Sequence, residues 1–264
     1  MATTPDTTSS GTVARVALLL TVLAEGPGEL SLTAVAERMR LPVSTTHRLL
    51  HLLIEEGFVD RGEAKGSYRP GLEFLRVGGL VSSRADLTAV AQPFMQAVVD
   101  ACDETCMLSV YQPRSGSAMI TKVIYGSHPL RYEAALYLPG SLVWGATGRG
   151  ILAFLPPDTI DAIVAREGPS PADPHQAVKP ATVKRELAII RKQGYAHTRG
   201  QKVRGAEGIA APIHNATGVT AALCLTLPDS RFEPAMEGRF ASTLVQQAAQ
   251  LSAALGWRGD GGGA

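Results

Sequence analysis

Side chains that can bind nucleic acid gather in one short segment of this sequence. Its apolar residues Leu49, Leu50 and Leu53 recur at helical spacing up to about Glu56. The opposite face of that helix carries polar and basic side chains, namely Thr45, His47, Arg48 and His51. A guanidinium can form two parallel hydrogen bonds with guanine, and a helix fits the major groove of DNA. Ser44 is expected to cap the helix and to contact a phosphate there.

Some of these side chains also have a simpler structural interpretation. Arg48 can form an ion pair with Glu55 or Glu56 on its own helix, and His51 can be a solvated surface residue. Thr46, on the side of the leucines, is predicted to be partly buried. The sequence leaves these alternatives open.

A hairpin is predicted directly after this helix. Phe58–Arg61 and Ser67–Arg69 read as short strands on either side of a glycine-containing turn. The hairpin carries three basic residues, Arg61, Lys65 and Arg69. They are expected to lie along the DNA backbone or minor groove, because neutralised phosphates supply most of the affinity for DNA. Lys65, at the tip, can alternatively serve only solubility.

The preceding residues predict the rest of a small helical domain. Helices are expected at Val13–Ala24 and at Leu32–Met39, the second capped by Ser31. A four-residue connection, Arg40 to Val43, separates the second helix from the third. Three helices followed by a hairpin make a winged helix-turn-helix.

The second half of the chain predicts an α+β domain around one mostly antiparallel sheet. Strands are expected at Thr105–Gln112, Ala118–Tyr125, Glu207–Ile213 and Val219–Leu227, and helices at Leu87–Cys102, Gly148–Leu155, Pro157–Ala165, Thr182–Gln193 and Ala235–Leu255. The resulting division is a flexible N-terminus 1–11, a DNA-binding domain 12–70, a helical linker 71–86, a ligand-binding domain 87–257 and a flexible tail 258–264. Gly78-Gly79 is the expected hinge in the linker.

Composition limits the classes of protein that fit. With 45% hydrophobic and 19% charged residues the chain can bury real cores. The net charge is only +1, and the first 84 residues contain as many acidic as basic residues, so a DNA site must depend on local arrangement. An odd number of cysteines and an N-terminus without a signal-like pattern predict a cytoplasmic protein with free thiols.

No metal or cofactor is expected. Cys102 and Cys106 stand four apart, but no second pair is placed to complete a zinc site. The glycines at 145, 148 and 150 lack the preceding strand and later acid of a dinucleotide-binding loop.

Three stretches resemble the IclR family of bacterial transcription regulators over most of the chain. They are Leu32–Val59 (LTAVAERMRLPVSTTHRLLHLLIEEGFV), Tyr68-Arg69-Pro70-Gly71-Leu72, and the pair Leu138–Pro156 (LPGSLVWGATGRGILAFLP) and Gly205–Ile213 (GAEGIAAPI) with Gly194-Tyr195-Ala196 before it. The resemblance implies a GAF-like effector-binding domain, a homodimer formed through the N-terminal domains, and often a tetramer. It also implies an effector pocket, which carries over to Trp144, Ala146, Thr147, Thr198, Gly208, Cys224 and Thr226.

The pocket departs from the family members that bind small polar acids. Those tend to have an acid where Thr198 stands, a cysteine at Gly208, and serines at Cys224 and Thr226. This version is less charged, and Leu136, Leu138, Leu142 and Trp144 add apolar wall nearby. A larger, partly apolar organic acid is therefore the expected effector.

The sequence thus predicts a DNA-binding transcription regulator, more readily a repressor than an activator, whose operator affinity changes when a small metabolite binds. It is not predicted to be an enzyme. The alternative from another class is a hydrolase with Cys224 as nucleophile and His197 or His214 as base, for which no nucleophile elbow or triad spacing exists. A second alternative is a ligand-binding protein that has lost DNA recognition.

Overall fold

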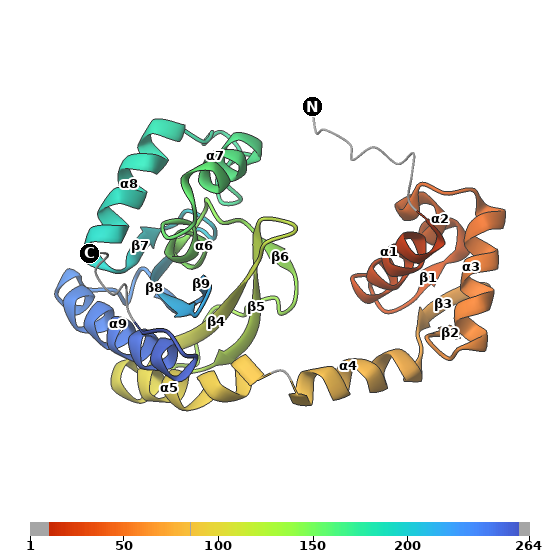
Figure 1. The fold of residues 1–264 in the computed structure, drawn as a ribbon, viewed down its shortest axis with the longest axis horizontal. Helices are drawn as coiled ribbons and strands as arrows, with labels where there is room; N and C mark the ends of the chain where they lie inside the picture. Colours follow the sequence, from red (N-terminus) through yellow and green to blue (C-terminus); the bar gives the residue numbers. More distant parts are fainter. Residues whose placement is uncertain (1–10, 85, 259–264) are drawn as a thin grey trace. The chain divides into compact units, whose positions relative to one another are not determined.

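The computed structural model describes residues 11–84 and 86–258, apart from the side chains of 79–84 and 86. The chain divides into two compact units, Met1–Ala85 and Asp86–Ala264 (Figure 1). Each unit has its own buried apolar core, and the mixed helix-and-sheet class predicted from the sequence is confirmed. The segments predicted to be flexible, 1–11 and 258–264, lie outside the described residues except for 11 and 258.

The first unit is a winged helix-turn-helix. Its elements are α1 (Thr12–Ala24), β1 (Leu30–Ser31), α2 (Leu32–Met39), α3 (Val43–Glu55), β2 (Val59–Arg61), β3 (Ser67–Pro70) and α4 (Leu72–Arg84). The strands form a small antiparallel sheet in the order β1-β3-β2. The hairpin β2–β3 is the predicted wing.

Local chemistry explains where the helices begin and end. Ser31 Oγ accepts a hydrogen bond of 3.2 Å from the backbone N–H of Ala34, which caps α2 as expected. Arg40 ends α2 in the left-handed conformation (φ 53°), and Gly57 (φ 72°) does the same after α3. The core between the helices and the wing consists of Leu19, Val22, Leu23, Leu30, Val35, Met39, Leu49, Leu50, Leu53, Val59 and Tyr68.

One expectation for this unit needs correction. Ser44 does not cap α3, because the helix begins at Val43 and the capping position is Pro42, without a side-chain hydrogen bond. Gly78 and Gly79 lie inside α4, so the predicted linker is helical at the position of the expected hinge.

The second unit contains one six-stranded antiparallel sheet. Its strands are β4 (Thr105–Gln112), β5 (Ser117–Ile124), β6 (Pro139–Gly140), β7 (Ala196–Arg199), β8 (Ala206–Asn215) and β9 (Gly218–Pro228), in the order β6-β5-β4-β9-β8-β7. The helices are α5 (Asp86–Cys102), α6 (Ala146–Leu152), α7 (Pro157–Arg166), α8 (Pro180–Gln193) and α9 (Glu237–Ala254), with a 3-10 turn at Pro234–Met236. The strands β6 and β7 were not predicted from the sequence.

Alternation along the central strands divides this unit into two layers. On β4, Cys106 and Leu108 face the core formed with α5 and α9, while Met107 faces the core formed with α6, α7 and α8. Figure 1 shows α5 and α9 side by side on one face of the sheet. The other face, under α6, is only partly filled by side chains.

Gly71 connects β3 to α4, and its backbone packs closely against residues 57–59 at the start of β2. A Cβ at this position would lie 2.3 Å from the Gly57 carbonyl oxygen and 2.8 Å from Val59 N. We expect Gly71→Ala to lower the free energy of unfolding by about 1–3 kcal/mol, because the backbone must move apart. Calorimetric unfolding of the full chain would measure the change.

Gly78→Ala is the matched control for that substitution. A Cβ at Gly78 would meet no atom within 4 Å, and alanine has the higher helix propensity. This variant should be as stable as the parent or slightly more stable. Equal effects of the two substitutions would contradict the close contact at Gly71.

Candidate nucleic-acid interface and ligand cavity

The exposed face of α3 carries the side chains that the sequence assigned to DNA. Leu49, Leu50 and Leu53 are buried against the rest of the first unit. On the opposite side, Thr45 is half-buried, and the other predicted side chains are exposed: Ser44, His47, Arg48 and His51. Thr46 is fully buried, and its hydroxyl donates to the Pro42 carbonyl at 3.2 Å. The helix therefore presents one continuous polar edge.

Arg48 is available for an external partner. Within residues 11–84 and 86–258, neither Glu55, Glu56 nor any other carboxylate forms an ion pair with its guanidinium. The alternative of an ion pair within the helix is thus not what the structure contains. The ring of His47 meets that of His51 edge-on at 5.4 Å, one turn further along the same edge.

The wing is held to the helices by an acidic side chain that the sequence reasoning missed. Glu29 accepts hydrogen bonds from the backbone N–H of Glu63 at 2.8 Å and from the Ser67 hydroxyl at 2.7 Å. These bonds lower the pKa of the Glu29 carboxyl below its ordinary value. The basic side chains of the wing, Arg61, Lys65 and Arg69, are all exposed.

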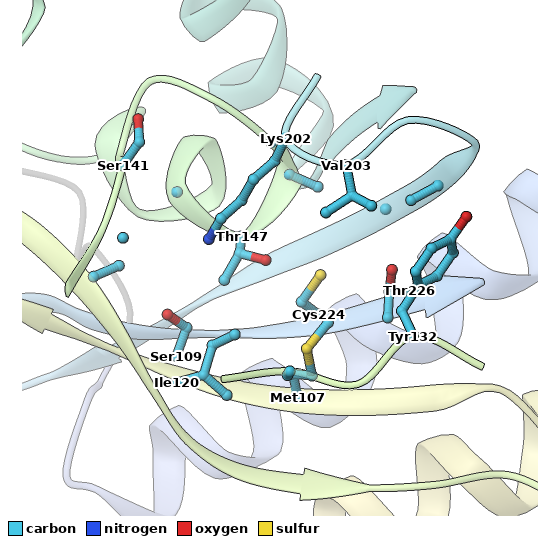
Figure 2. A pocket seen from close by; sticks show the side chains of 18 of the residues that line it. Met107, Ser109, Ile120, Tyr132, Ser141, Thr147, Lys202, Val203, Cys224 and Thr226 are labelled. Atoms are coloured by element: carbon cyan, nitrogen blue, oxygen red, sulfur yellow. The ribbon is translucent and has the colours of Figure 1, made fainter. Parts of the chain in front are cut away.

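The second unit contains a cavity of about 350 Å³ between α6 and the sheet. Its floor is one face of the central strands, with Met107 and Ser109 from β4 and Ile120 from β5 (Figure 2). Residues 132–141 and 201–203 cover it together with the start of α6. The size lies at the small end of the range for small-molecule sites.

Most of the residues that the resemblance placed in an effector pocket line this one cavity. They are Ala146, Thr147, Thr198, Gly208, Cys224 and Thr226. Pairing across the sheet brings some of them together, since Gly208 lies opposite both Thr198 and Thr226. Gly208 also keeps the cavity open, because a Cβ there would lie 3.1 Å from the Ala146 side chain.

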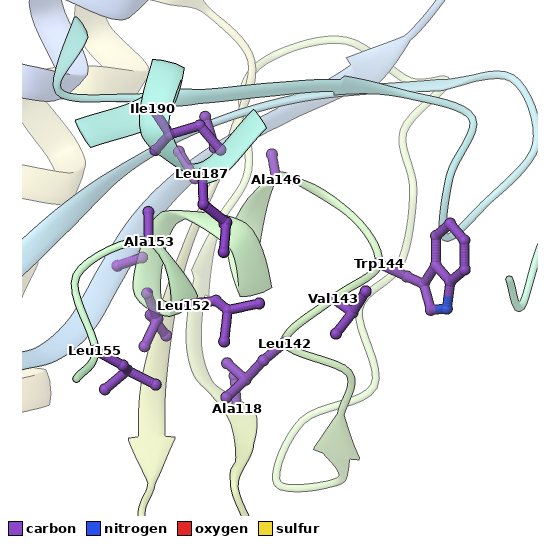
Figure 3. Packing of buried hydrophobic residues seen from close by; sticks show 14 of the residues in the cluster. Ala118, Leu142, Val143, Trp144, Ala146, Leu152, Ala153, Leu155, Leu187 and Ile190 are labelled. Carbon is purple, nitrogen blue, oxygen red and sulfur yellow. The ribbon is translucent and has the colours of Figure 1, made fainter. Parts of the chain in front are cut away.

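Trp144 is placed differently from the expectation. It is buried in the apolar cluster beside Val143 (Figure 3), and its indole N–H donates to the Gly168 carbonyl at 3.0 Å. The lining of the cavity does not include it. Leu142 belongs to the same buried cluster, whereas Leu138 does line the cavity. The indole position could not be read from spacing alone.

Cys224 has an environment that suppresses its reactivity. Burial raises the pKa of the thiol to about 11, although a hydrogen bond with Thr147 and the positive charge of Lys202 both act to lower it. Lys202 was not predicted as a site residue. It comes from the loop after β7, and no motif or periodicity marks it in the sequence.

The two histidines proposed as a catalytic base lie away from Cys224. His197 belongs to β7, where its Nε2 lies 2.8 Å from Glu207 Oε2 and its Nδ1 3.3 Å from Glu237 Oε2. It pairs with Ile209, which faces the α5–α9 core on the other side of the sheet. His214 pairs with Val219 at the far end of β9, and its ring stacks on Trp257.

The described part of the chain has neither a metal-binding cluster nor a membrane-spanning helix. No group of three His, Cys, Asp or Glu side chains in it is arranged to hold a metal ion. None of its helices has the length and apolar character needed to cross a membrane.

Comparison with known proteins gives relatives over nearly the whole chain. The Transcriptional repressor IclR of Escherichia coli is 28% identical over 259 residues, which is 97% of this chain and 94% of that protein. An HTH-type transcriptional regulator of Mycobacterium tuberculosis is 31% identical over 230 residues, 86% of each chain.

Solved structures share the fold. An IclR transcriptional regulator from Alicyclobacillus acidocaldarius superposes with a TM-score of 0.81 at 24% identity, over 93% of this chain and 98% of that one. An IclR homolog from Microbacterium hydrocarbonoxydans, complexed with 4-hydroxybenzoate, gives a TM-score of 0.78 at 22% identity, over 93% and 99%.

Two family descriptions account for both units. "IclR helix-turn-helix domain" matches residues 12–63, and "Bacterial transcriptional regulator IclR C-terminal" matches residues 80–253. With the exposed edge of α3 in the first unit and the cavity in the second, this chain belongs to the IclR family of bacterial transcription regulators, with a DNA-binding and a ligand-binding domain.

Proposed function

We propose that this chain is a homodimeric repressor, acting in the cytoplasm, whose affinity for operator DNA changes when a partly apolar organic acid binds its cavity. The observation that carries the proposal is the free, exposed edge of α3 around Arg48. We assign residues 12–70 to DNA binding, 71–86 to the linker and 87–257 to effector binding.

The edge of α3 suits direct recognition of bases. A helix in the major groove can bring Thr45 and His47 to base edges, while Arg48 forms a bidentate pair with guanine or grips a phosphate. Ser44, in the first turn of the helix, would contact a phosphate, and His51 extends the same polar edge by one turn. The chemistry of these five side chains therefore supports sequence-specific binding.

The wing supplies contacts of a different kind. Arg61, Lys65 and Arg69 are exposed on a hairpin whose position is held by the Glu29 carboxylate. Charges of this type neutralise phosphates and carry no sequence information by themselves. Because the unit as a whole has no basic excess, we attribute its affinity to these few positions.

The assembly we propose is a dimer formed through the first unit. Apolar side chains stand exposed on two of its helices, with Val13 84% exposed on α1 and Leu72 75% and Leu75 64% exposed on α4. Burying them against a second copy would remove apolar surface from water. A two-fold dimer presents two recognition helices to half-sites about one helical turn of DNA apart. We expect the second units to join such dimers into a tetramer.

The cavity supports control by a small molecule. Its lining is mostly apolar, as in Met107, Ile120 and Leu138, with a few polar groups, and a relative of the same fold is known in complex with 4-hydroxybenzoate. A ligand that prefers one arrangement of the dimer must change DNA affinity, typically by about 1–3 kcal/mol. This supports a partly apolar organic acid as the effector.

Substitution of Arg48 tests the DNA-binding edge. Arg48→Ala should weaken binding to an operator fragment by about 1–3 kcal/mol, because a bidentate contact is lost while no internal ion pair is broken. Fluorescence anisotropy with DNA from upstream of the chain's own gene would measure the affinity. Arg185→Ala, at an exposed position of α8 in the other unit, is the matched control. Unchanged affinity of the Arg48 variant would remove this residue from the interface.

Lys65 gives a separate test of the wing. Lys65→Ala should weaken binding to operator and unrelated DNA alike, and should reduce the slope of log affinity against log salt by about 1. Titrations at several salt concentrations would determine the slope. A loss confined to one DNA sequence would mean that Lys65 reads bases.

Reactivity of Cys224 distinguishes this function from a thiol hydrolase. Because the pKa of Cys224 is about 11 against 9.0 for a free thiol, the thiolate fraction near pH 8 is reduced about a hundredfold. Alkylation by iodoacetamide, followed by mass spectrometry, should be slower in the folded chain by at least that factor than in urea. The rate should rise as the pH approaches 11. Rapid modification near pH 7 would indicate an activated nucleophile and contradict the proposal.

A further inference from the structure

Two polar side chains face the cavity from opposite sides and lie outside the set that the resemblance assigned to it. One is the hydroxyl of Ser109 on the floor, and the other is the amino group of Lys202 in the covering loop. Figure 2 shows the Lys202 amino group directed down into the cavity and the Ser109 hydroxyl directed up from the sheet. They come from segments almost a hundred residues apart in the chain.

Ser109 lacks the partner that its burial demands. The residue is 1% exposed, and its Oγ has no hydrogen-bond partner in the structure. It stands where β4 changes register with β5, between Leu108 and Ser109, on the face that lines the cavity. A buried hydroxyl without a partner is unfavourable, so a ligand that supplies one would gain affinity.

Lys202 reaches the cavity because two glycines leave room for it. A Cβ on Gly140 would lie 3.0 Å from Lys202 Nζ, and a Cβ on Gly145 would lie 3.2 Å from Lys202 Cβ. Over the described part of the chain, no carboxylate lies within ion-pair distance of Lys202 Nζ. The positive charge therefore has no counter-charge of its own there.

Several other polar groups of the lining are engaged by neighbouring residues. Thr226 Oγ1 donates to the Glu207 carbonyl at 3.1 Å, and the Ser141 hydroxyl accepts from the backbone N–H groups of Val143 and Trp144. The Glu207 carboxylate is held by His197 and Arg199. Lys202 is the one cation among the described residues that line the cavity.

We infer that Lys202 and Ser109 together bind the carboxylate of a ligand with a single negative charge. The ammonium and the hydroxyl each donate a hydrogen bond to the carboxylate, and the apolar body of the ligand packs against Met107 and Ile120. A second negative charge would have no cation to meet, so dicarboxylates and phosphate esters are disfavoured. This inference rests on the proposed function, since it names the chemical class of the effector and the residues that select it.

Pairs of acids and their amides test the inference, since they have the same shape and differ in charge. Isothermal titration calorimetry on the full chain would compare benzoate with benzamide and hexanoate with hexanamide. We expect at least one acid to bind, and to bind about tenfold or more tightly than its amide, as for charge-assisted hydrogen bonds. Equal binding within both pairs, or no binding of either acid at millimolar concentration, would overturn the inference.

Variants locate the charge that recognises the acid. Lys202→Met keeps the length of the side chain but removes its charge, and it should reduce the preference for the acid to about threefold or less. Lys192→Met, at an exposed position in the last turn of α8, is the matched control and should keep the preference. Circular dichroism would confirm that both variants fold. A preference that survives Lys202→Met would also overturn the inference.

Ser109→Ala separates a ligand contact from a structural role. Since the hydroxyl has no partner, its removal should leave the melting temperature of the ligand-free chain unchanged or slightly higher. It should also lower the affinity for the acid about fivefold or more. Loss of stability without loss of affinity would contradict the assignment.

Measurements of operator affinity distinguish failure of the proposed regulation from failure of the inference about Lys202 and Ser109. An acid that binds through Lys202 without changing operator affinity would refute the effector role and leave the inference standing. An amide that binds as well as its acid and still changes operator affinity would do the opposite.

Discussion

The two-residue period of antiparallel strands is the constraint on which the ligand-binding unit depends. Along β4, Cys106 and Leu108 point to the core under α5 and α9, and Met107 and Ser109 point to the other side. The same alternation runs across β8 and β9 through register-matched pairs. One face of the sheet can therefore be filled completely while the other retains a cavity, without any break in the hydrogen-bonded ladder. A slip of one residue would exchange the two faces.

In the DNA-binding unit, the helical period likewise separates a buried face from an exposed one. Leu49, Leu50 and Leu53 are buried, and this leaves Arg48 and His47 on the edge that faces outward. The wing needs a different device because a short hairpin is only marginally stable alone. Here the Glu29 carboxylate holds the hairpin through hydrogen bonds to its backbone and to a serine hydroxyl. Both sites are thus set by which faces their elements bury.

The positive charge in the cavity comes from a loop that covers the sheet. The strands contribute mainly small and apolar groups and hydroxyls, and the Glu207 carboxylate among them is paired with His197 and Arg199. Lys202 adds a positive charge, since the glycines at positions 140 and 145 leave space for its side chain to enter. Its charge is close enough to lower the pKa of the Cys224 thiol, although burial outweighs it. Such a loop can alter ligand preference without disturbing the sheet, as expected where binding residues sit on loops over a rigid scaffold.

Local pattern in the sequence was sufficient for α2, α3, β4 and β9, because their periodicity, and for α2 also its Ser31 cap, is contained within a few consecutive residues. Resemblance brought Thr147, Cys224 and Thr226 to the cavity, where the structure places them. The strands β1 and β6 have two residues each, too few to show a period, and they exist only because distant strands pair with them. The directions of the Trp144 and His197 side chains, and the placement of Lys202 and Ser109 around one cavity, likewise depend on contacts between distant segments. The sequence therefore determined the elements and the family, and only the tertiary structure decided which polar groups face the cavity, because that depends on long-range packing.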